Sequence, residues 1–277
     1  MAVWLGRRFG KPVVLDFRDA WLLNPHNALA GLRRRAIVRL ERRAFEGATR
    51  VIVNTSGAAR LYRQTYPEHA AKFVVIPNGY DALTPSPGHG VRAGEFLIVH
   101  IGSFYGQRTP DALLEALARI GRRDVVFVHA GAPFASYQRF RERVNIRLLG
   151  ALPRDEAQQV LQDASLLYLK QGRETGVDQY IAVASKTYEY LATGLPILAD
   201  CPEGDNAEIV RQYCLAPFVV TTGLVGDLER AIREAVDCRL RLPLGLSPDF
   251  VTRFDRRSLT AALGDLLDEV VAQGRSV

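Results

Sequence analysis

The chain has 277 residues, a length typical of about two domains at roughly 150 residues each. Its composition, with 48% hydrophobic and 24% charged residues, is that of a globular protein and excludes a disordered, collagen-like or low-complexity chain. No apolar run reaches the roughly 18 residues that a membrane span needs, and residues 1–10 do not form a secretory signal.

The charge balance is basic, with a net charge of +6. Only four of the 36 basic residues are lysines, and an arginine bias of this kind is typical of a GC-rich genome, so the basic balance alone is weak evidence of function. It still permits anionic partners such as nucleotide phosphates or an acidic membrane surface. Three cysteines without a CxxC pair indicate reduced thiols and predict a cytoplasmic protein.

The first part of the chain begins with a helix and then alternates short apolar runs with helical patterns. Three such runs are typical of buried parallel strands: 11–17, 50–54 and 72–77. Helices are predicted over 32–45, where apolar residues recur every four positions, and over about 56–65. The stretch 84–94 is rich in Pro and Gly and is interpreted as a domain linker.

The alternation is fuller beyond the linker. Six strands are predicted, over 96–101, 124–130, 145–149, 166–169, 195–199 and 218–220. Helices are predicted near 110–120, 134–143, 157–164, 185–194, 206–213, 227–238 and 257–272.

This rhythm predicts an α/β protein with doubly wound parallel sheets. The predicted organisation is a partial N-terminal domain over 1–83, the linker 84–94, a C-terminal domain over 95–250, and a terminal helical segment, 251–277, that packs back on the N-terminal part. Ligands of such sheets bind outside the carboxyl ends of the strands, so polar residues there are the candidate site.

The first candidate is the loop from Gly102 to Arg108, which follows the strand 96–101. Gly102 and Ser103 allow close backbone approach, and Arg108 offers a bidentate fork to a diphosphate. The alternative is an ordinary turn with a solvated arginine.

The second candidate is the helix that begins near Ser185. Lys186 and Glu189 lie three residues apart and so share one face of the helix. A lysine near a helix N-terminus is unfavourable unless an anion lies there, and a carboxylate one turn later can accept hydrogen bonds from vicinal ribose hydroxyls. The alternative is a plain ion pair.

Five segments together resemble GT-B glycosyltransferases of the family 4, or group 1, type. SKTYEYLATGLPILA (185–199) is similar to the donor-site helix of that family, and the other four occur in the family's order: PVVLDFRDAW (12–21), VVIPNGYD (74–81), IGSFYGQRTPDALL (101–114) and IRLLGAL (146–152). The resemblance runs from about residue 11 to 255. It implies a GT-B-like fold with a complete C-terminal Rossmann-like donor domain and a partial N-terminal Rossmann-like domain.

The resemblance also implies roles. Glu189 would bind the ribose of a nucleotide sugar, and Arg108 and Lys186 would neutralise the diphosphate and act in catalysis by stabilising the leaving group. The other donor-binding positions are Gly102 and Ser103 beside the phosphates, Ala151 and Leu152 beside the base, and the backbone of Val183, Ala184 and Ser185. No cofactor is implied, and no DxD-type metal cluster is present in the sequence.

Two departures from the family pattern matter. A second glutamate of the family signature, which contacts the donor sugar, is replaced here by Ile181; Glu174 and Asp178 precede it as candidate substitutes. The first half of the family's N-terminal domain has no counterpart in this sequence. The chain alone is therefore expected to transfer sugar weakly or not at all.

Several residues outside the donor loops are also candidates. Asp16, Arg18 and Asp19 at the first strand end would contact acceptor or donor sugar, or form a structural salt bridge. Lys170 is a further cleft candidate, whereas His100 and His129 are interpreted as satisfied core histidines. Helix 32–45 carries six arginines that would meet anionic lipid and fit a lipid-linked acceptor, or would simply be solvated.

The function predicted is metal-independent glycosyl transfer, of hexosyltransferase type, from a nucleotide sugar to an unidentified acceptor at the cytoplasmic side of the membrane. The alternative is a non-catalytic subunit that binds a nucleotide sugar or a partner protein. Nucleic-acid binding is not expected, because no such motif is present. The strands before residue 80 show little polar alternation, which predicts self-association through residues 1–80.

Overall fold

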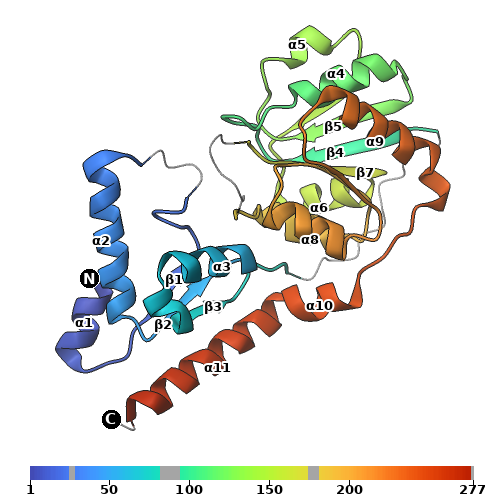
Figure 1. The fold of residues 1–277 in the computed structure, drawn as a ribbon. Helices are drawn as coiled ribbons and strands as arrows, with labels where there is room; N and C mark the ends of the chain where they lie inside the picture. Colours follow the sequence, from blue (N-terminus) through green and yellow to red (C-terminus); the bar gives the residue numbers. More distant parts are fainter. Residues whose placement is uncertain (25–28, 82–93, 174–180, 276–277) are drawn as a thin grey trace. The chain divides into compact units, whose positions relative to one another are not determined.

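The computed structural model describes residues 1–24, 29–81, 94–173 and 181–275 (Figure 1). The described chain divides into two compact units. Unit 1 contains residues 1–79, 181–183 and 252–275, and unit 2 contains residues 80–81, 94–173 and 184–251. The predicted linker 84–94 lies outside the described residues except for Gly94.

Unit 1 is built on a parallel sheet of three described strands in the order β1-β2-β3. Helices lie before, between and after these strands along the chain. The elements are α1 (Ala2–Phe9), β1 (Val14–Phe17), α2 (Gly31–Gly47), β2 (Arg50–Val53), α3 (Ser56–Thr65), η1 (Pro67–Lys72), β3 (Phe73–Val75) and, after unit 2, α11 (Arg256–Arg275).

The sheet of unit 1 is covered on both faces, because side chains alternate along each strand. Val51 and Val53 pack with Phe45 of α2 and Tyr62 of α3 on one face. Ile52, between them in the sequence, packs with Leu266 of α11 on the other face. The alternation of β2 thus explains how a short strand anchors both layers, including the C-terminal helix; Arg50 adds an ion pair with Glu269 at 2.6 Å.

Unit 2 is built on a parallel sheet of six described strands in the order β6-β5-β4-β7-β8-β9, with β4 and β7 in the middle. This order reverses between β4 and β7, which is where doubly wound sheets bind ligands. The strands are β4 (Phe96–Ile101), β5 (Val125–Ala130), β6 (Asn145–Gly150), β7 (Leu166–Lys170), β8 (Ile197–Asp200) and β9 (Pro217–Val220).

Helices cover both faces of this sheet. Side chains of α4, α5 and α9 form one core with Phe96, Ile98 and Phe127, while α6, α7 and α8 contact β4, β7 and β8. The helical elements are α4 (Asp111–Ile120), α5 (Tyr137–Phe140), α6 (Arg154–Gln162), α7 (Ser185–Leu191), α8 (Asp205–Tyr213), α9 (Val225–Asp237), η2 (Arg239–Arg241) and α10 (Pro248–Phe254), whose end belongs to unit 1.

The nine predicted strands are all present, and the predicted α/β class with parallel sheets is confirmed. Helix boundaries differ by up to three residues: α5 begins three residues after the predicted 134, and α6 begins three residues before the predicted 157. Pro110 and Ala184 occupy the N-cap positions of α4 and α7. Helix α10 was not predicted, because a seven-residue helix that starts at a proline gives little periodic signal.

Candidate functional site

The carboxyl end of β4 is held by two side chains from the first turns of α7. Lys186 Nζ donates to the carbonyl oxygen of Ile101 at 2.8 Å, and the backbone N–H of Ile101 donates to Tyr190 Oη at 2.9 Å. The two residues lie four apart, so they share one face of α7. Both backbone groups of Ile101 are thus satisfied by one helix, which fixes α7 against the strand end.

Gly102, the next residue, has a backbone φ of 102°, a conformation that favours glycine. A Cβ at this position would lie 3.0 Å from Lys186 Nζ. Gly102 therefore leaves room for the ammonium group at the strand end, and its place beside a phosphate stays a prediction.

The surroundings of Lys186 disfavour its charged form. Burial and the nearby charge of Arg108 lower the pKa of Lys186 to about 8, and the carboxylate of Glu189 acts in the opposite direction. Arg108 and Glu189 are thus charged groups near enough to act on Lys186, and Glu189 is exposed. A bound anion would relieve the repulsion between Lys186 and Arg108.

Two buried histidines, His100 on β4 and His129 on β5, form hydrogen bonds near the carboxyl ends of the central strands. His129 Nε2 donates to the carbonyl oxygen of Gly102 at 2.9 Å and its Nδ1 accepts from Tyr137 Oη at 2.9 Å. His100 Nδ1 donates to the carbonyl oxygen of Tyr168 at 2.7 Å. Burial lowers the pKa of both rings, and the nearby charge of Lys186 lowers both further. Both histidines are hydrogen-bonded core residues, as interpreted from the sequence.

Arg108 is held by Tyr105. Its guanidinium donates to Tyr105 Oη and lies 4.8 Å from the centre of that ring. Tyr105 is itself 60% exposed, so the pair projects from the loop after β4 instead of packing into the core. Tyr105 was not singled out from the sequence; an aromatic residue three positions before an arginine in a loop is too common a pattern.

The remaining donor-loop candidates are exposed or half-buried. Ser103 is exposed and its Oγ accepts from the backbone N–H of Ala132 at 3.3 Å. Ala151 is exposed and Leu152 half-buried in the turn between β6 and α6. Glu189 is exposed and lies close enough to Arg154 to raise the pKa of that guanidinium, although the ion pair with Asp81 at 2.9 Å contributes more. The structure thus brings Asp81 of the VVIPNGYD segment and Arg154 into the surroundings of Glu189.

The segment before α7 divides between the two units. Ala184 and Ser185 belong to unit 2, whereas Val183 belongs to unit 1. Ile181 is 5% exposed within the core of unit 1, where its carbonyl oxygen accepts from Thr55 Oγ1 at 3.2 Å. The position of the family's second glutamate is therefore a packing position in this chain. Glu174 and Asp178 lie outside the described residues.

Lys170 ends β7 in a buried ionic cluster. Its Nζ lies 2.7 Å from Asp200 Oδ2, and Arg173 contacts the other oxygen of the same carboxylate at 2.8 Å. Tyr168 Oη also donates to Asp200 at 2.9 Å. The Asp200 carboxylate thus accepts from Tyr168, Lys170 and Arg173 at the ends of β7 and β8. A contact of Lys170 with the nucleotide-sugar substrate stays a prediction.

In unit 1, Asp16 and Arg18 form an ion pair at 3.0 Å. Arg18 also donates to Asn78 Oδ1 at 2.7 Å, and Asn54 donates to the backbone oxygen of Arg18 at 2.8 Å. These bonds join the ends of all three strands. They correspond to the structural salt bridge that the sequence offered as the alternative to a sugar contact. Asp19 is exposed.

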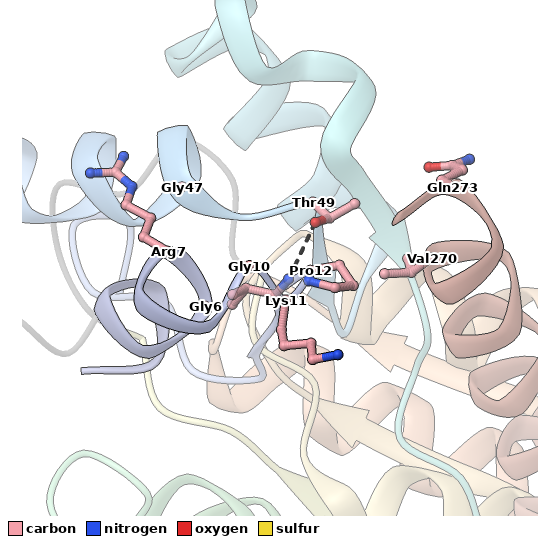
Figure 2. Close-up of a pocket in the computed structure, with 10 residues that line it drawn as sticks. Gly6, Arg7, Gly10, Lys11, Pro12, Gly47, Thr49, Val270 and Gln273 are labelled. Carbon is pink, nitrogen blue, oxygen red and sulfur yellow. Dashed lines mark hydrogen bonds between the residues drawn. The ribbon is translucent and has the colours of Figure 1, made fainter. Parts of the chain in front are cut away.

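A pocket of about 310 Å³ lies at the opposite end of the sheet in unit 1 (Figure 2). Val13 donates to Thr49 Oγ1 at 3.2 Å in its wall, and Val270 and Gln273 of α11 complete the lining. The pocket lies where β1 and β2 begin, whereas open α/β sheets bind ligands where strands end. It is therefore not part of the candidate site.

Within the described ranges, no group of three or more His, Cys, Asp or Glu side chains is placed to hold a metal ion. Among the same residues, no helix combines the length and apolar character that crossing a membrane would require.

Comparison with known proteins identifies the class of the fold. Residues 1–79 match the family model of the glycosyl transferase 4-like domain. The structure is similar to that of Anabaena HepE in complex with UDP, with a TM-score of 0.72 at 19% identity over 96% of this chain and 75% of that one. The fold is thus the GT-B fold, and the predicted resemblance to GT-B glycosyltransferases is confirmed.

Two further similar proteins are longer than this chain and are matched over only part of their length. The chain is 30% identical over 128 residues to a D-inositol 3-phosphate glycosyltransferase of Nocardiopsis dassonvillei, a match that covers 43% of this chain and 30% of that protein. A sucrose-phosphate synthase from Thermosynechococcus elongatus has a TM-score of 0.72 at 17% identity, over 98% of this chain and 72% of that one. The chain thus matches less than a third of the length of its curated relative.

Proposed function

We propose that this chain binds a nucleotide sugar through unit 2 and belongs to a glycosyltransferase that passes the sugar to an acceptor without a metal ion, with only weak transfer by the chain alone. The observation that carries the proposal is the position of Lys186 Nζ at the end of β4, a central strand, where it bonds the Ile101 carbonyl oxygen next to Gly102 and where the charge of Arg108 is near enough to lower its pKa. Two cations that repel each other in the free protein gain most from a ligand with two negative phosphates.

The residue roles are those that the resemblance to GT-B glycosyltransferases implies, and the chemistry of the charged side chains supports them. Arg108 and Lys186 bind the diphosphate and stabilise the charge that develops on the leaving nucleoside diphosphate, since electrostatic stabilisation of the leaving group replaces a divalent ion. Glu189 accepts hydrogen bonds from the ribose hydroxyls, and the turn at Ala151 and Leu152 lies beside the base. HepE, a protein of the same fold, has been crystallised with UDP and with UDP-glucose, which supports a uridine nucleotide as the first donor to test.

Calorimetry with UDP, GDP and ADP tests nucleotide binding, and donor consumption with and without acceptors tests transfer. Binding of none of the three nucleotides contradicts the proposal. Because Ile181 replaces the family's second glutamate and is buried, a non-catalytic nucleotide-sugar-binding subunit is the second candidate. Both candidates bind the nucleotide, and only weak transfer is expected of the chain alone, so acceptor-dependent donor consumption is the result that would exclude the second candidate.

We also propose that the protein works in the cytoplasm at an anionic membrane surface and uses a lipid-linked acceptor. Arginines 33, 34, 35, 39, 42 and 43 of α2 are all exposed, and Leu32 and Leu40 beside them are 81% and 52% exposed. Interleaved basic and apolar side chains on one helix fit an anionic bilayer surface.

A further inference from the structure

His100 faces the ammonium group of Lys186 from within the sheet. Its Nδ1 lies 2.7 Å from the carbonyl oxygen of Tyr168. A carbonyl oxygen can only accept, so Nδ1 carries the proton, and in the neutral ring Nε2 is left as an acceptor. That Nε2 lies 3.5 Å from Lys186 Nζ, at the outer limit of a hydrogen bond.

The ring is fixed in this orientation. His100 is 1% exposed and stacks on Phe104, with ring centres 4.2 Å apart and planes 16° apart. The ring cannot turn Nε2 away without losing the Tyr168 hydrogen bond in a buried setting, which is costly. The neighbouring strand residue His129 uses both of its nitrogens elsewhere, on Gly102 and Tyr137.

We propose that His100 is a positioning residue that holds the ammonium group of Lys186 over Gly102, where the proposed function requires a cation for the diphosphate. The neutral Nε2 lone pair and the Ile101 carbonyl oxygen are two acceptors for one ammonium group, and they leave its third hydrogen for a phosphate oxygen. His100 acts through Lys186 and takes no part in contact with the ligand.

The charged groups around Lys186 set the pH range over which its ammonium group titrates. Arg108 from the loop after β4 opposes protonation of Lys186, and Glu189 from its own helix favours it. His129 on β5 lies near enough to be influenced by Lys186, but burial keeps it neutral. Among these side chains His100 is the one whose neutral ring nitrogen faces Lys186 Nζ, so we expect its removal to lower the pKa of Lys186 without adding or removing a charge.

Two substitutions separate the two ring nitrogens. His100→Asn keeps a donor near the position of Nδ1 for the Tyr168 carbonyl and removes the acceptor at Nε2, whereas His100→Gln reaches the position of Nε2 with an amide oxygen. Competitive labelling with acetic anhydride across pH, read by peptide mass, reports the titration of Lys186 in the ligand-free protein. The sequence has only four lysines, and Lys72 in unit 1 is the internal control.

We expect His100→Asn to move the Lys186 labelling midpoint down by about half a pH unit, with Lys72 unchanged, and His100→Gln to restore it. UDP affinity should fall about fivefold in His100→Asn relative to wild type. In a Lys186→Met background, the same His100→Asn change should leave UDP affinity unchanged. Equal midpoints in wild type and His100→Asn, with matching melting temperatures, would overturn the proposal. Failure of the wild type to bind UDP, with the midpoint shift present, would instead contradict the proposed function alone.

Discussion

Lys186 is a residue whose placement favours a bound anion over the stability of the free protein. Its folded-state pKa of about 8 lies below the ordinary lysine value, so the unfolded chain binds the proton more tightly than the folded one. The cost is full below pH 8 and disappears as pH rises through the unfolded value near 10.4. We expect Lys186→Met to raise the free energy of unfolding by about 1–3 kcal/mol at pH 7.

Urea unfolding of both proteins at several pH values checks this prediction. The advantage of Lys186→Met should shrink between pH 8 and pH 10, because the wild-type lysine loses its charge in the folded state first. UDP affinity of the wild type should fall over the same interval. A variant that is less stable than wild type at pH 7 would show that the Ile101 hydrogen bond outweighs the buried charge.

Glu189 is exposed, and no hydrogen bond of its side chain is found within the described part of the chain. Its removal should therefore affect a ligand far more than the fold. We expect Glu189→Ala to weaken UDP binding about ten- to a hundredfold, because hydrogen bonds to a charged group are worth about 1.5–3 kcal/mol. Calorimetry measures this, with Glu234→Ala on the exposed side of α9 as control. Equal affinity of Glu189→Ala and wild type would remove Glu189 from the site.

Arg108 differs from Lys186 in that a stacked tyrosine orients it. Arg108→Ala should weaken UDP binding more than uridine binding, because its partner is the phosphate. Arg108→Lys should recover only part of the loss, since a point charge reproduces neither the fork nor the stacking on Tyr105. Calorimetry with both ligands decides between a phosphate contact and a structural role, which would weaken uridine binding as much.

At the scale of elements, α2 offers a test of the membrane proposal. Replacement of Arg33, Arg34 and Arg35 by glutamine should weaken binding to phosphatidylserine vesicles about a hundredfold, at roughly 1 kcal/mol per arginine, with wild-type binding falling as salt rises. The matched control replaces Arg119, Arg122 and Arg123 by glutamine. These arginines are exposed in unit 2, and their replacement removes the same charge. Vesicle sedimentation that responds equally to both triple variants would indicate net charge rather than a docking helix.

Elements of this fold were predictable where one physical signal dominated. Strands such as β4 and β5 are continuous apolar runs because helices cover both faces, and that pattern is visible in the sequence alone. The partners of His100 and Lys170 were not predictable, since Tyr168 and Asp200 are 68 and 30 residues away and meet them only through the strand order. Sequence spacing could place Lys186 and Glu189 on one helix, but not show that Lys186 reaches across to β4.

At the scale of the whole molecule, α1 presents an apolar surface. Trp4 and Phe9 are each 65% exposed, while the opposite side of the helix is packed, with Val3 against Gly47 and Gly6 against Val13. Next to it, β1 pairs with β2 alone among the described strands. Exposed apolar side chains beside an open strand edge favour association. We expect the full chain to self-associate and Trp4→Glu combined with Phe9→Glu to shift it to monomer in light scattering.

Salt distinguishes this association from the lipid contact of α2. Arg7, Arg8 and Lys11 lie beside the apolar side chains of α1, so two copies that meet there also bring like charges together. Salt screens that repulsion and leaves the apolar contact, so self-association should strengthen with salt while vesicle binding weakens. Leu32→Glu, at a position 81% exposed on α2, is the control that should leave the oligomeric state unchanged. A monodisperse monomer at high salt would show that the open edge of β1 and the α1 surface do not drive association.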